Sequence, residues 1–245
     1  MTLSIILQDR SVFNYTNAVS CVTCGEYDDG SGYGFMVYLK GDTENGIVII
    51  MSFYAGSPVT AETAQRAIRH SETAGVDYIP ADINLANAET LMVTMISKEH
   101  ILRRILTEDV IGAYDFVLID CLPSLGTLLI NALTAADRVL IPVQTQKFSM
   151  DGLQSLEALT QLVKANTNPK LNLIGVLPTM VDRTKVSRTA IETLNEKYGE
   201  MLFRTSISKS IEAAKSSENG TPLCLTGHKL GQEYDELAQE ALSRC

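Results

Sequence analysis

Short apolar runs alternate with longer segments of helical periodicity along the chain from residue 58 onward. The apolar runs contain few polar positions, which is typical of strands covered on both faces, and they lie at 76–80, 114–119, 138–143 and 171–177. The segments with helical spacing lie at 60–70, 87–106, 124–134, 149–165, 184–198 and 230–242. Because parallel strands need crossover connections, this order predicts an α/β fold with a mostly parallel sheet flanked by helices on both faces.

The first 57 residues have a different pattern, which is rich in β-prone residues. Two apolar runs at 35–39 and 47–53 enclose the turn-forming residues 40–46, and this arrangement predicts a β-hairpin. The pattern changes at Ser57 and Pro58. We therefore expect residues 1–57 to form an atypical β-rich, hairpin-containing segment packed on the main domain, and residues 58–245 to form the α/β domain.

Charge and composition exclude several classes of protein. The net charge of −9 argues against a protein that coats nucleic acid with its whole surface, although a local basic patch stays compatible with it. No apolar run approaches the roughly 20 residues that span a bilayer, so we expect no membrane partner. Five cysteines at irregular spacing make a disulfide framework improbable and favour a reduced, cytoplasmic setting.

Polar residues follow three of the predicted strands. Asp120 ends one strand before a proline-containing turn, Gln144 ends the next, and Asp182 closes the segment 178–182 after a third. Ligands of open α/β sheets bind beyond the carboxyl ends of the strands. A carboxylate in the position of Asp120 is typical of phosphate-handling folds that hold magnesium through water, and the alternative is a helix-capping aspartate.

Several segments in a fixed order resemble the ParA/MinD family of partition ATPases, and most of all its Soj-like chromosome and plasmid partition branch. They are YDFVLIDCLPS at 114–124, NALTAADRVLIPVQ at 131–144, DGL at 151–153 and GVLPTMVD at 175–182. The resemblance covers roughly residues 76–243. It implies a P-loop-NTPase-like fold and an ATP- and magnesium-dependent dimer. It also implies that the dimer binds DNA non-specifically and acts on a DNA cargo with a partition adaptor protein.

The resemblance assigns roles to individual positions. Asp120 corresponds to the magnesium-associated catalytic aspartate, Pro123 and Ser124 to the segment that senses the γ-phosphate, and Met180 and Asp182 to the surroundings of the adenine. Cations in two segments correspond to the family's DNA contacts: Arg183, Lys185, Arg188, Lys209 and Lys215. The stretch 178–215 holds seven Lys or Arg and five Asp or Glu, so it is net positive within an acidic chain. The alternative interpretation of these cations is a solvated helix face.

The family's phosphate loop, of the form KGGxGKTT, is absent from this sequence. No glycine is followed by lysine, and residues 4–14 contain no glycine. The glycine-rich stretch 30–34 has no lysine and follows two aspartates, which would repel phosphate. We therefore expect a ParA-like protein with an impaired or absent ATPase, in which residues 4–7, 35–39 or 47–53 take the place of the missing first strand.

Two alternatives to that interpretation stay open. One is a non-catalytic interaction protein that forms a homodimer, or a heterodimer with an intact relative. The other is a decayed or rearranged fragment of a partition ATPase. A smaller departure from the family is Leu122, which replaces the first proline of the family's proline pair. If DNA binding is retained, the resemblance implies association with the nucleoid in the cytoplasm.

Overall fold

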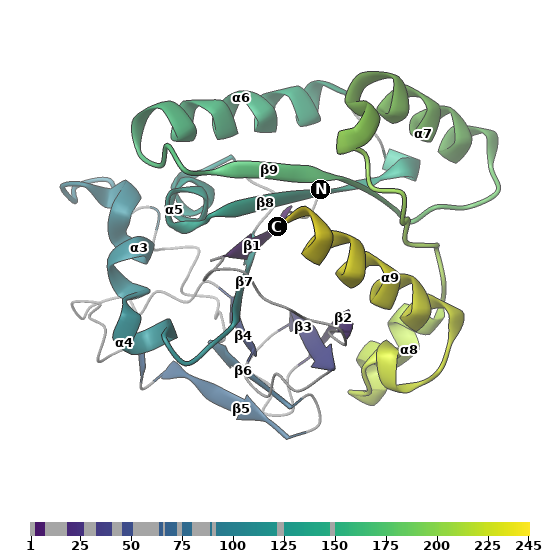
Figure 1. Ribbon diagram of the computed structural model, residues 1–245, viewed down its shortest axis with the longest axis horizontal. Helices are drawn as coiled ribbons and strands as arrows, with labels where there is room; N and C mark the ends of the chain where they lie inside the picture. Colours follow the sequence, from purple (N-terminus) through teal and green to yellow (C-terminus); the bar gives the residue numbers. More distant parts are fainter. Residues whose placement is uncertain are drawn as a thin grey trace.

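A computed structural model describes a seven-stranded sheet and a separate two-stranded ribbon (Figure 1). The described residues are 3–7, 19–26, 33–40, 46–50, 64–65, 67–72, 75–79, 89, 92–121, 125–147 and 150–245. No helix among them is long and apolar enough to cross a membrane. The predicted division of the chain at residue 57 stays a prediction, although strands from both sides of that point lie in the same sheet.

The large sheet has the strand order β5-β6-β4-β7-β1-β8-β9. Its strands are β1 (Leu3–Leu7), β4 (Gly46–Ile50), β5 (Arg69–Ser71), β6 (Val76–Ile79), β7 (Phe116–Cys121), β8 (Arg138–Gln144) and β9 (Asn172–Thr179). Strands β6, β4 and β7 pair in parallel, as do β8 and β9. Strands β5 and β1 run antiparallel to their neighbours. The expected mostly parallel α/β sheet is therefore confirmed.

Strand β1 lies between β7 and β8, so residues 4–7 fill an interior place in the sheet. The predicted hairpin between 35–39 and 47–53 is wrong. Strand β3 (Tyr33–Lys40) pairs with β2 (Val19–Glu26), whereas β4 pairs with β6 and β7. The turn residues predicted a local pairing. The continuous apolar run of β4 instead suits a strand with neighbours on both sides, which gains two hydrogen-bonded ladders.

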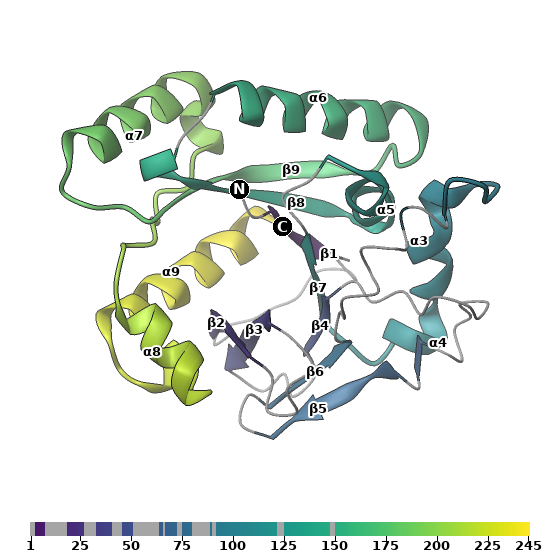
Figure 2. The same ribbon diagram turned by 180° about the vertical axis from the view of Figure 1, so that it is seen from behind.

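Helices cover both faces of the β8–β9 pair (Figures 1 and 2). Helices α6 (Met150–Asn166) and α7 (Lys185–Tyr198) lie over one face, and α9 (Lys229–Arg244) lies over the other. Helix α8 (Glu212–Asn219) and α9 contact the ribbon strand β2. The remaining described helices are α3 (Ile101–Ile105), α4 (Glu108–Ile111) and α5 (Thr127–Ala135). The helices expected at 124–134, 149–165, 184–198 and 230–242 are thus confirmed within a few residues.

The helix expected across 87–106 is interrupted. Residues 93–97 form turns, and Ser97 has a left-handed backbone with φ 54° before the short 3-10 helix η1 (Lys98–His100) and α3. Residues 80–88, 90 and 91 lie outside the described residues. Likewise, the end of the helix expected at 60–70 forms strand β5. Both differences concern segments in which apolar spacing alone could not locate the backbone break.

Two apolar clusters lie on opposite faces of the sheet. On strand β8, Val139, Ile141 and Val143 belong to the cluster beneath α5 and α6, whereas Leu140 belongs to the cluster beneath α9. Ile141 is fully buried. The second cluster also contains Phe203. Burial on both faces explains why the run 138–143 has no alternation of polar and apolar residues.

Residues 202–209 run along the outer edge of β9 as a broken edge strand. The N–H of Phe203 donates to the carbonyl of Val176 at 2.9 Å, and the N–H of Ile207 donates to the carbonyl of Pro178 at 3.0 Å. Isolated parallel bridges join this segment to β9 and to residue 181 just beyond it. The edge of β9 is therefore covered, and the chain from 202 to 209 runs in the direction of β9 toward the carboxyl ends of the strands.

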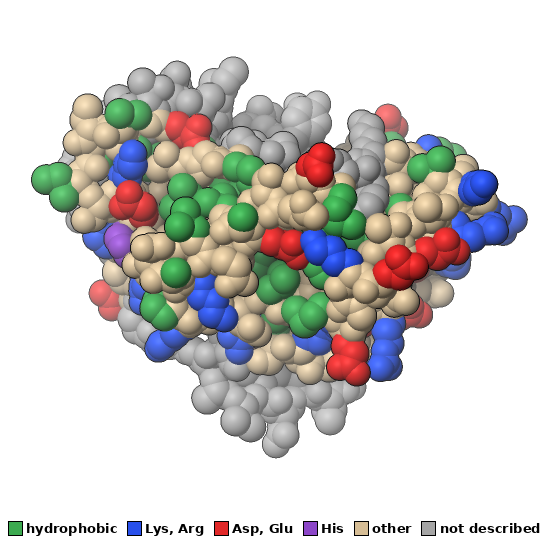
Figure 3. All heavy atoms as spheres, turned by 90° about the horizontal axis from the view of Figure 1, so that it is seen from above, with side chains coloured by type: hydrophobic (Ala, Val, Ile, Leu, Met, Phe, Trp, Pro, Cys, Tyr) green, Lys and Arg blue, Asp and Glu red, His purple; other side chains and the backbone are tan. Residues whose placement is uncertain are grey.

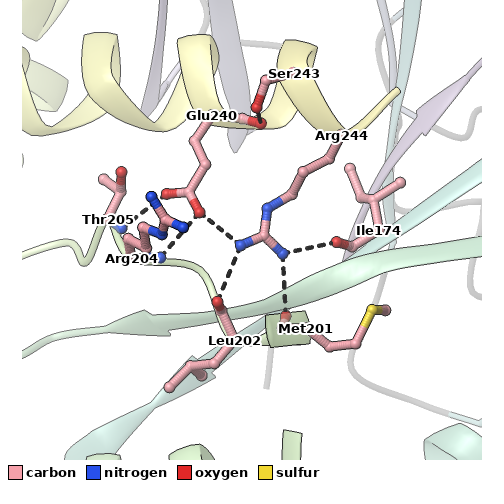
Figure 4. Close-up of polar contacts among 8 residues, drawn as sticks. All are labelled: Ile174, Met201, Leu202, Arg204, Thr205, Glu240, Ser243 and Arg244. Atoms are coloured by element: carbon pink, nitrogen blue, oxygen red, sulfur yellow. Dashed lines mark hydrogen bonds and ion pairs between the residues drawn. The ribbon is translucent and has the colours of Figure 1, made fainter. Parts of the chain in front are cut away.

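Arg244 fastens the end of α9 to this edge (Figure 4). Its guanidinium donates to the carbonyls of Ile174 at 3.1 Å and Leu202 at 3.0 Å and to the Glu240 carboxylate at 2.6 Å. It also lies 4.1 Å from the centroid of the Phe203 ring. Gly175 leaves room for this approach, because a Cβ there would lie 2.8 Å from the Arg244 side chain.

We expect Arg244→Ala to lower the free energy of unfolding by about 2–3 kcal/mol, because it leaves partly buried carbonyls and a carboxylate without their charged donor. Urea denaturation followed by circular dichroism measures this. Arg104→Ala is the matched control, since Arg104 is exposed and makes one described hydrogen bond, to the Ser97 carbonyl at 3.4 Å. An equal effect of the two substitutions would contradict the role given to Arg244.

Candidate functional site

Asp120 lies near the carboxyl end of β7, opposite Ser4 of β1 on one side and Ile50 of β4 on the other. Its Oδ1 atom is buried and accepts no hydrogen bond within the described part of the chain. Burial raises the pKa of this carboxyl to about 7, and a backbone hydrogen bond from Cys121 opposes the shift only in part. An interior carboxylate with a spare oxygen suits a water-bridged or direct contact with a hard cation.

The surroundings of Asp120 do not supply the rest of a magnesium–triphosphate site. Among the described residues, no group of three or more His, Cys, Asp or Glu could hold a metal ion. The neighbouring β1 is antiparallel to β7, with Leu3 opposite Cys121 and Leu7 opposite Val117. The chain therefore leaves β1 near the amino-terminal end of β7, which is the end of the strand away from Asp120. Asp120 fits a magnesium ion, but the described residues do not fit a cradle for phosphates.

Pro123 and Ser124, which the resemblance assigns to γ-phosphate sensing, lie outside the described residues. Their role stays a prediction.

A polar cluster joins the ends of β8 and β9. The Asp182 carboxylate accepts hydrogen bonds from the side-chain amide of Gln146 and from the backbone N–H of Thr184, the latter at 3.0 Å. The Lys209 ammonium donates to the Gln146 amide oxygen at 3.3 Å. The pKa of Asp182 is lowered, first by the hydrogen bonds from Thr184 and further by Gln146 and Lys209. The structure thus brings Asp182 and Lys209 together through Gln146.

Buried hydroxyls hold this cluster against the first turn of α7. Thr145, in the 3-10 helix η2 (Thr145–Lys147), lies within 2.8 Å of the Ser187 hydroxyl, and both residues are fully buried. The Ser187 hydroxyl accepts a hydrogen bond from the Asp182 N–H at 3.3 Å. Thr184 caps α7 by accepting from the Ser187 N–H at 3.2 Å. Thr145, Gln146 and Ser187 were not singled out from the sequence, although two of them directly follow Gln144.

Met180 lies beside this cluster, with a left-handed backbone, φ 53°, and a residue exposure of 39%. Asp120 lies at a different level of the sheet. Ser4 is opposite both Asp120 and Leu140, so β8 continues four residues beyond that level to Gln144. At a rise of roughly 3.3 Å per residue this is about 13 Å along the strand. No described contact joins Asp120 to Asp182 or to Met180.

Four of the five predicted DNA-contacting cations gather near the start of α7. Arg183, Lys185 and Arg188 are exposed, and none forms an ion pair with a described carboxylate. Lys209 joins them because its backbone N–H donates to the Val181 carbonyl at 2.8 Å. Figure 3 shows Lys and Arg side chains at the right-hand end of the molecule, where α7 lies, with acidic side chains beside them.

Lys215 differs from these four cations. It is exposed on α8 and forms an ion pair with Glu212 at 2.7 Å, three residues earlier in the chain. Its charge is therefore partly balanced within its own helix.

A sequence profile described as an AAA domain matches residues 32–173. The chain is 38% identical over 176 residues to the sporulation initiation inhibitor protein Soj of Bacillus subtilis, and the match covers 71% of this chain and 69% of that protein. It is 34% identical over 178 residues to the chromosome partitioning protein ParA of Caulobacter vibrioides, where it covers 71% and 67%.

Solved structures share the fold. A cobyrinic acid a,c-diamide synthase from Mycobacterium smegmatis superposes with a TM-score of 0.64 at 26% identity, over 81% of each chain. An ATP complex of McdA from Cyanothece superposes with a TM-score of 0.66 at 19% identity, over 82% of this chain and 86% of that one. Together with the strand-end motifs, these matches show that the chain belongs to the ParA/MinD family of partition ATPases and has its P-loop-NTPase-like fold.

Proposed function

We propose that this protein is a ParA-like DNA partitioning or segregation protein with an impaired or absent ATPase. We further propose that it binds DNA through Arg183, Lys185 and Arg188 at the start of α7, the α7 cations. The partition branch of the assignment is supported by relatives named for chromosome partitioning. The observation that carries the ATPase part of the proposal is the direction of β1. Strand β1 lies beside Asp120 and leads the chain to the other end of β7, at Val117.

The chemistry of phosphoryl transfer explains why this direction matters. Catalysis depends on positioning the phosphates and on balancing their charge, mainly through a loop of backbone N–H groups and a lysine. Asp120 can contribute a magnesium ligand, but one carboxylate supplies neither of these functions. The sequence has no Gly-Lys pair at any position. We propose that magnesium and ATP bind weakly, with Asp120 as the metal contact and Met180 and Asp182 on the adenine side.

The proposed DNA surface consists of Arg183, Lys185, Arg188 and Lys209, with Lys215 as a weaker contributor. Their exposure and their position on one side of the β9 end suit contacts with successive phosphates. Such contacts carry no sequence information, so the binding is non-specific. The ion pair with Glu212 must be broken before Lys215 can contact a phosphate, which reduces its contribution.

The proposed partners are DNA, a partition adaptor protein, and a second subunit that is either this chain or an intact relative. A cytoplasmic, nucleoid-associated location goes with this assignment. The missing phosphate loop also favours a second candidate, a non-catalytic interaction protein that pairs with such a relative. The observable property that separates the two candidates is co-purification: the second predicts that an intact relative co-purifies with this protein.

We expect isothermal titration calorimetry to give a Mg-ATP dissociation constant above about 1 mM. A site that consists of one carboxylate and an adenine pocket lacks most of the phosphate contacts. Asp120→Ala should weaken this binding further, because it removes the proposed metal contact. A sub-millimolar dissociation constant for Mg-ATP, together with loss of binding in Asp120→Ala, would contradict the proposal that the nucleotide site is impaired. An intact partition ATPase measured under the same conditions is the positive control.

Asp120 should also make stability depend on pH. Its pKa is about 7 in the folded protein and about 3.9 when unfolded, so the folded state binds more protons between these values. The free energy of unfolding therefore falls as pH rises from about 4 to 7, relative to Asp120→Asn. At pH 8 the variant should be more stable by roughly 4 kcal/mol, from about three pKa units at about 1.4 kcal/mol each, and near pH 4 the two should agree. A wild type that gains stability over the variant between pH 4 and 7 would contradict this.

Arg183→Ala and Lys185→Ala should each weaken binding to random-sequence duplex DNA by about fivefold and lower the salt slope by about one. Fluorescence anisotropy at several salt concentrations measures both quantities. Lys170→Ala is the control, because Lys170 is exposed just before the opposite end of β9. Lys215→Ala should have a smaller effect than Lys185→Ala. Equal losses of DNA affinity for Lys170→Ala and Lys185→Ala would contradict the proposal that DNA binds at the α7 cations.

A further inference from the structure

Residues 207–209 are hydrogen-bonded on both sides. On the β9 side, the Ile207 carbonyl accepts from the Val181 N–H at 3.0 Å, and the Lys209 N–H donates to the Val181 carbonyl at 2.8 Å. In an extended segment, successive N–H groups point to opposite sides, so the N–H of Ser208 is directed away from β9. It faces α9, where Glu233 lies.

Glu233 accepts the hydrogen bonds of Ser208 on the side of the segment that faces away from β9. Its carboxylate accepts from the Ser208 N–H at 2.7 Å and from the Ser208 hydroxyl at 2.7 Å. The Lys229 ammonium donates to the same carboxylate at 2.9 Å, and the Glu233 side chain is only 12% exposed. Burial acts to raise the pKa of Glu233, but the hydrogen bonds from Lys229 and Ser208 lower it below its usual value. The group is therefore a well-satisfied, ionised carboxylate.

The next residue after Ser208 is Lys209, a proposed DNA contact. Its backbone is fixed by Val181, and its ammonium reaches Gln146 and thereby Asp182. A shift of Ser208 would move Lys209 relative to the cations of α7. The contacts of Glu233 thus determine where Lys209 is held.

Glu240 provides a comparison on the same helix, two turns later. Its carboxylate accepts from the N–H groups of Arg204 at 2.9 Å and Thr205 at 2.8 Å, and it is bound by Arg244 (Figure 4). The chemistry is similar to that of Glu233, because each carboxylate accepts two hydrogen bonds from the edge segment 202–209. For Glu233 the donors are one N–H and one hydroxyl, and for Glu240 they are two N–H groups. Neither Arg204 nor Thr205 belongs to the proposed DNA surface.

We propose that Glu233 is a positioning residue for DNA binding, which holds Ser208 so that Lys209 lies beside the α7 cations. Glu240 fastens the same edge segment without affecting those cations. This inference rests on the proposed DNA-binding role of Lys209. The two carboxylates of α9 have different tasks because the residue that Glu233 caps is joined directly to a DNA-contacting lysine, whereas the residues that Glu240 caps are not.

Random-sequence duplex DNA and Glu233→Gln test the inference. We expect affinity to fall about fivefold and the salt slope to fall by about one, as for the loss of one phosphate contact. In a Lys209→Gln background, Glu233→Gln should cause no further loss, because it acts through Lys209. Glu240→Gln should leave DNA affinity unchanged. Additive losses from Glu233→Gln and Lys209→Gln would overturn the inference.

Amide hydrogen exchange gives a readout that does not depend on DNA. We expect Glu233→Gln to speed exchange at Ser208 and Lys209 at least tenfold, and Glu240→Gln to do so at Arg204 and Thr205 instead. If the wild type binds no DNA, the proposed function fails, and exchange alone decides whether Glu233 positions Lys209. Unchanged exchange at Lys209 overturns the inference. Should Glu233→Gln not fold, Ser208→Ala removes one of the three bonds and should shift affinity and exchange in the same direction.

Discussion

The parallel pair β8–β9 is the part of the structure on which the candidate surface depends. Both strands are buried on both faces, with Ile141 and Val176 in one apolar cluster and Leu140 and Leu177 in the other. Such a pair cannot slip in register without exposing apolar side chains to water on one face. Its carboxyl end therefore has a fixed position. The hydroxyls and amides just beyond that end, from Thr145 onward, hold α7 and the edge segment 202–209 in place.

The direction of β1 separates two properties that a partition ATPase would combine. The cations of the proposed DNA surface lie at the start of α7 and on the edge segment 202–209, beyond the carboxyl end of β9, and none of them lies on β1. A phosphate loop would have to reach the neighbourhood of Asp120, but β1 directs the chain away from it. Under the proposed function, the DNA-binding surface persists while nucleotide chemistry is weakened.

Sequence reasoning predicted the strands and the longer helices from about 116 onward, because buried strands and amphipathic helices there have unambiguous periodicity. It did not predict the short helix α8. It also indicated the strand-end residues Asp120 and Asp182. It did not predict the pairing of β3 with β2, since turn residues report only local reversal and not which strands meet. It missed Gln146 and Glu233, whose importance comes from partners 36 and 25 residues distant in the sequence. Such contacts leave no local pattern.

The most direct test of the central claim is the effect of Mg-ATP on the affinity of the purified protein for random-sequence duplex DNA at one fixed salt concentration. Fluorescence anisotropy measures this effect when the titration is run with and without about 1 mM Mg-ATP. That concentration is near the lowest dissociation constant expected for the weak site. We predict measurable DNA binding whose dissociation constant changes less than about twofold on adding the nucleotide. A tenfold or larger change that Asp120→Ala abolishes would contradict the claim, as would the absence of DNA binding in both conditions.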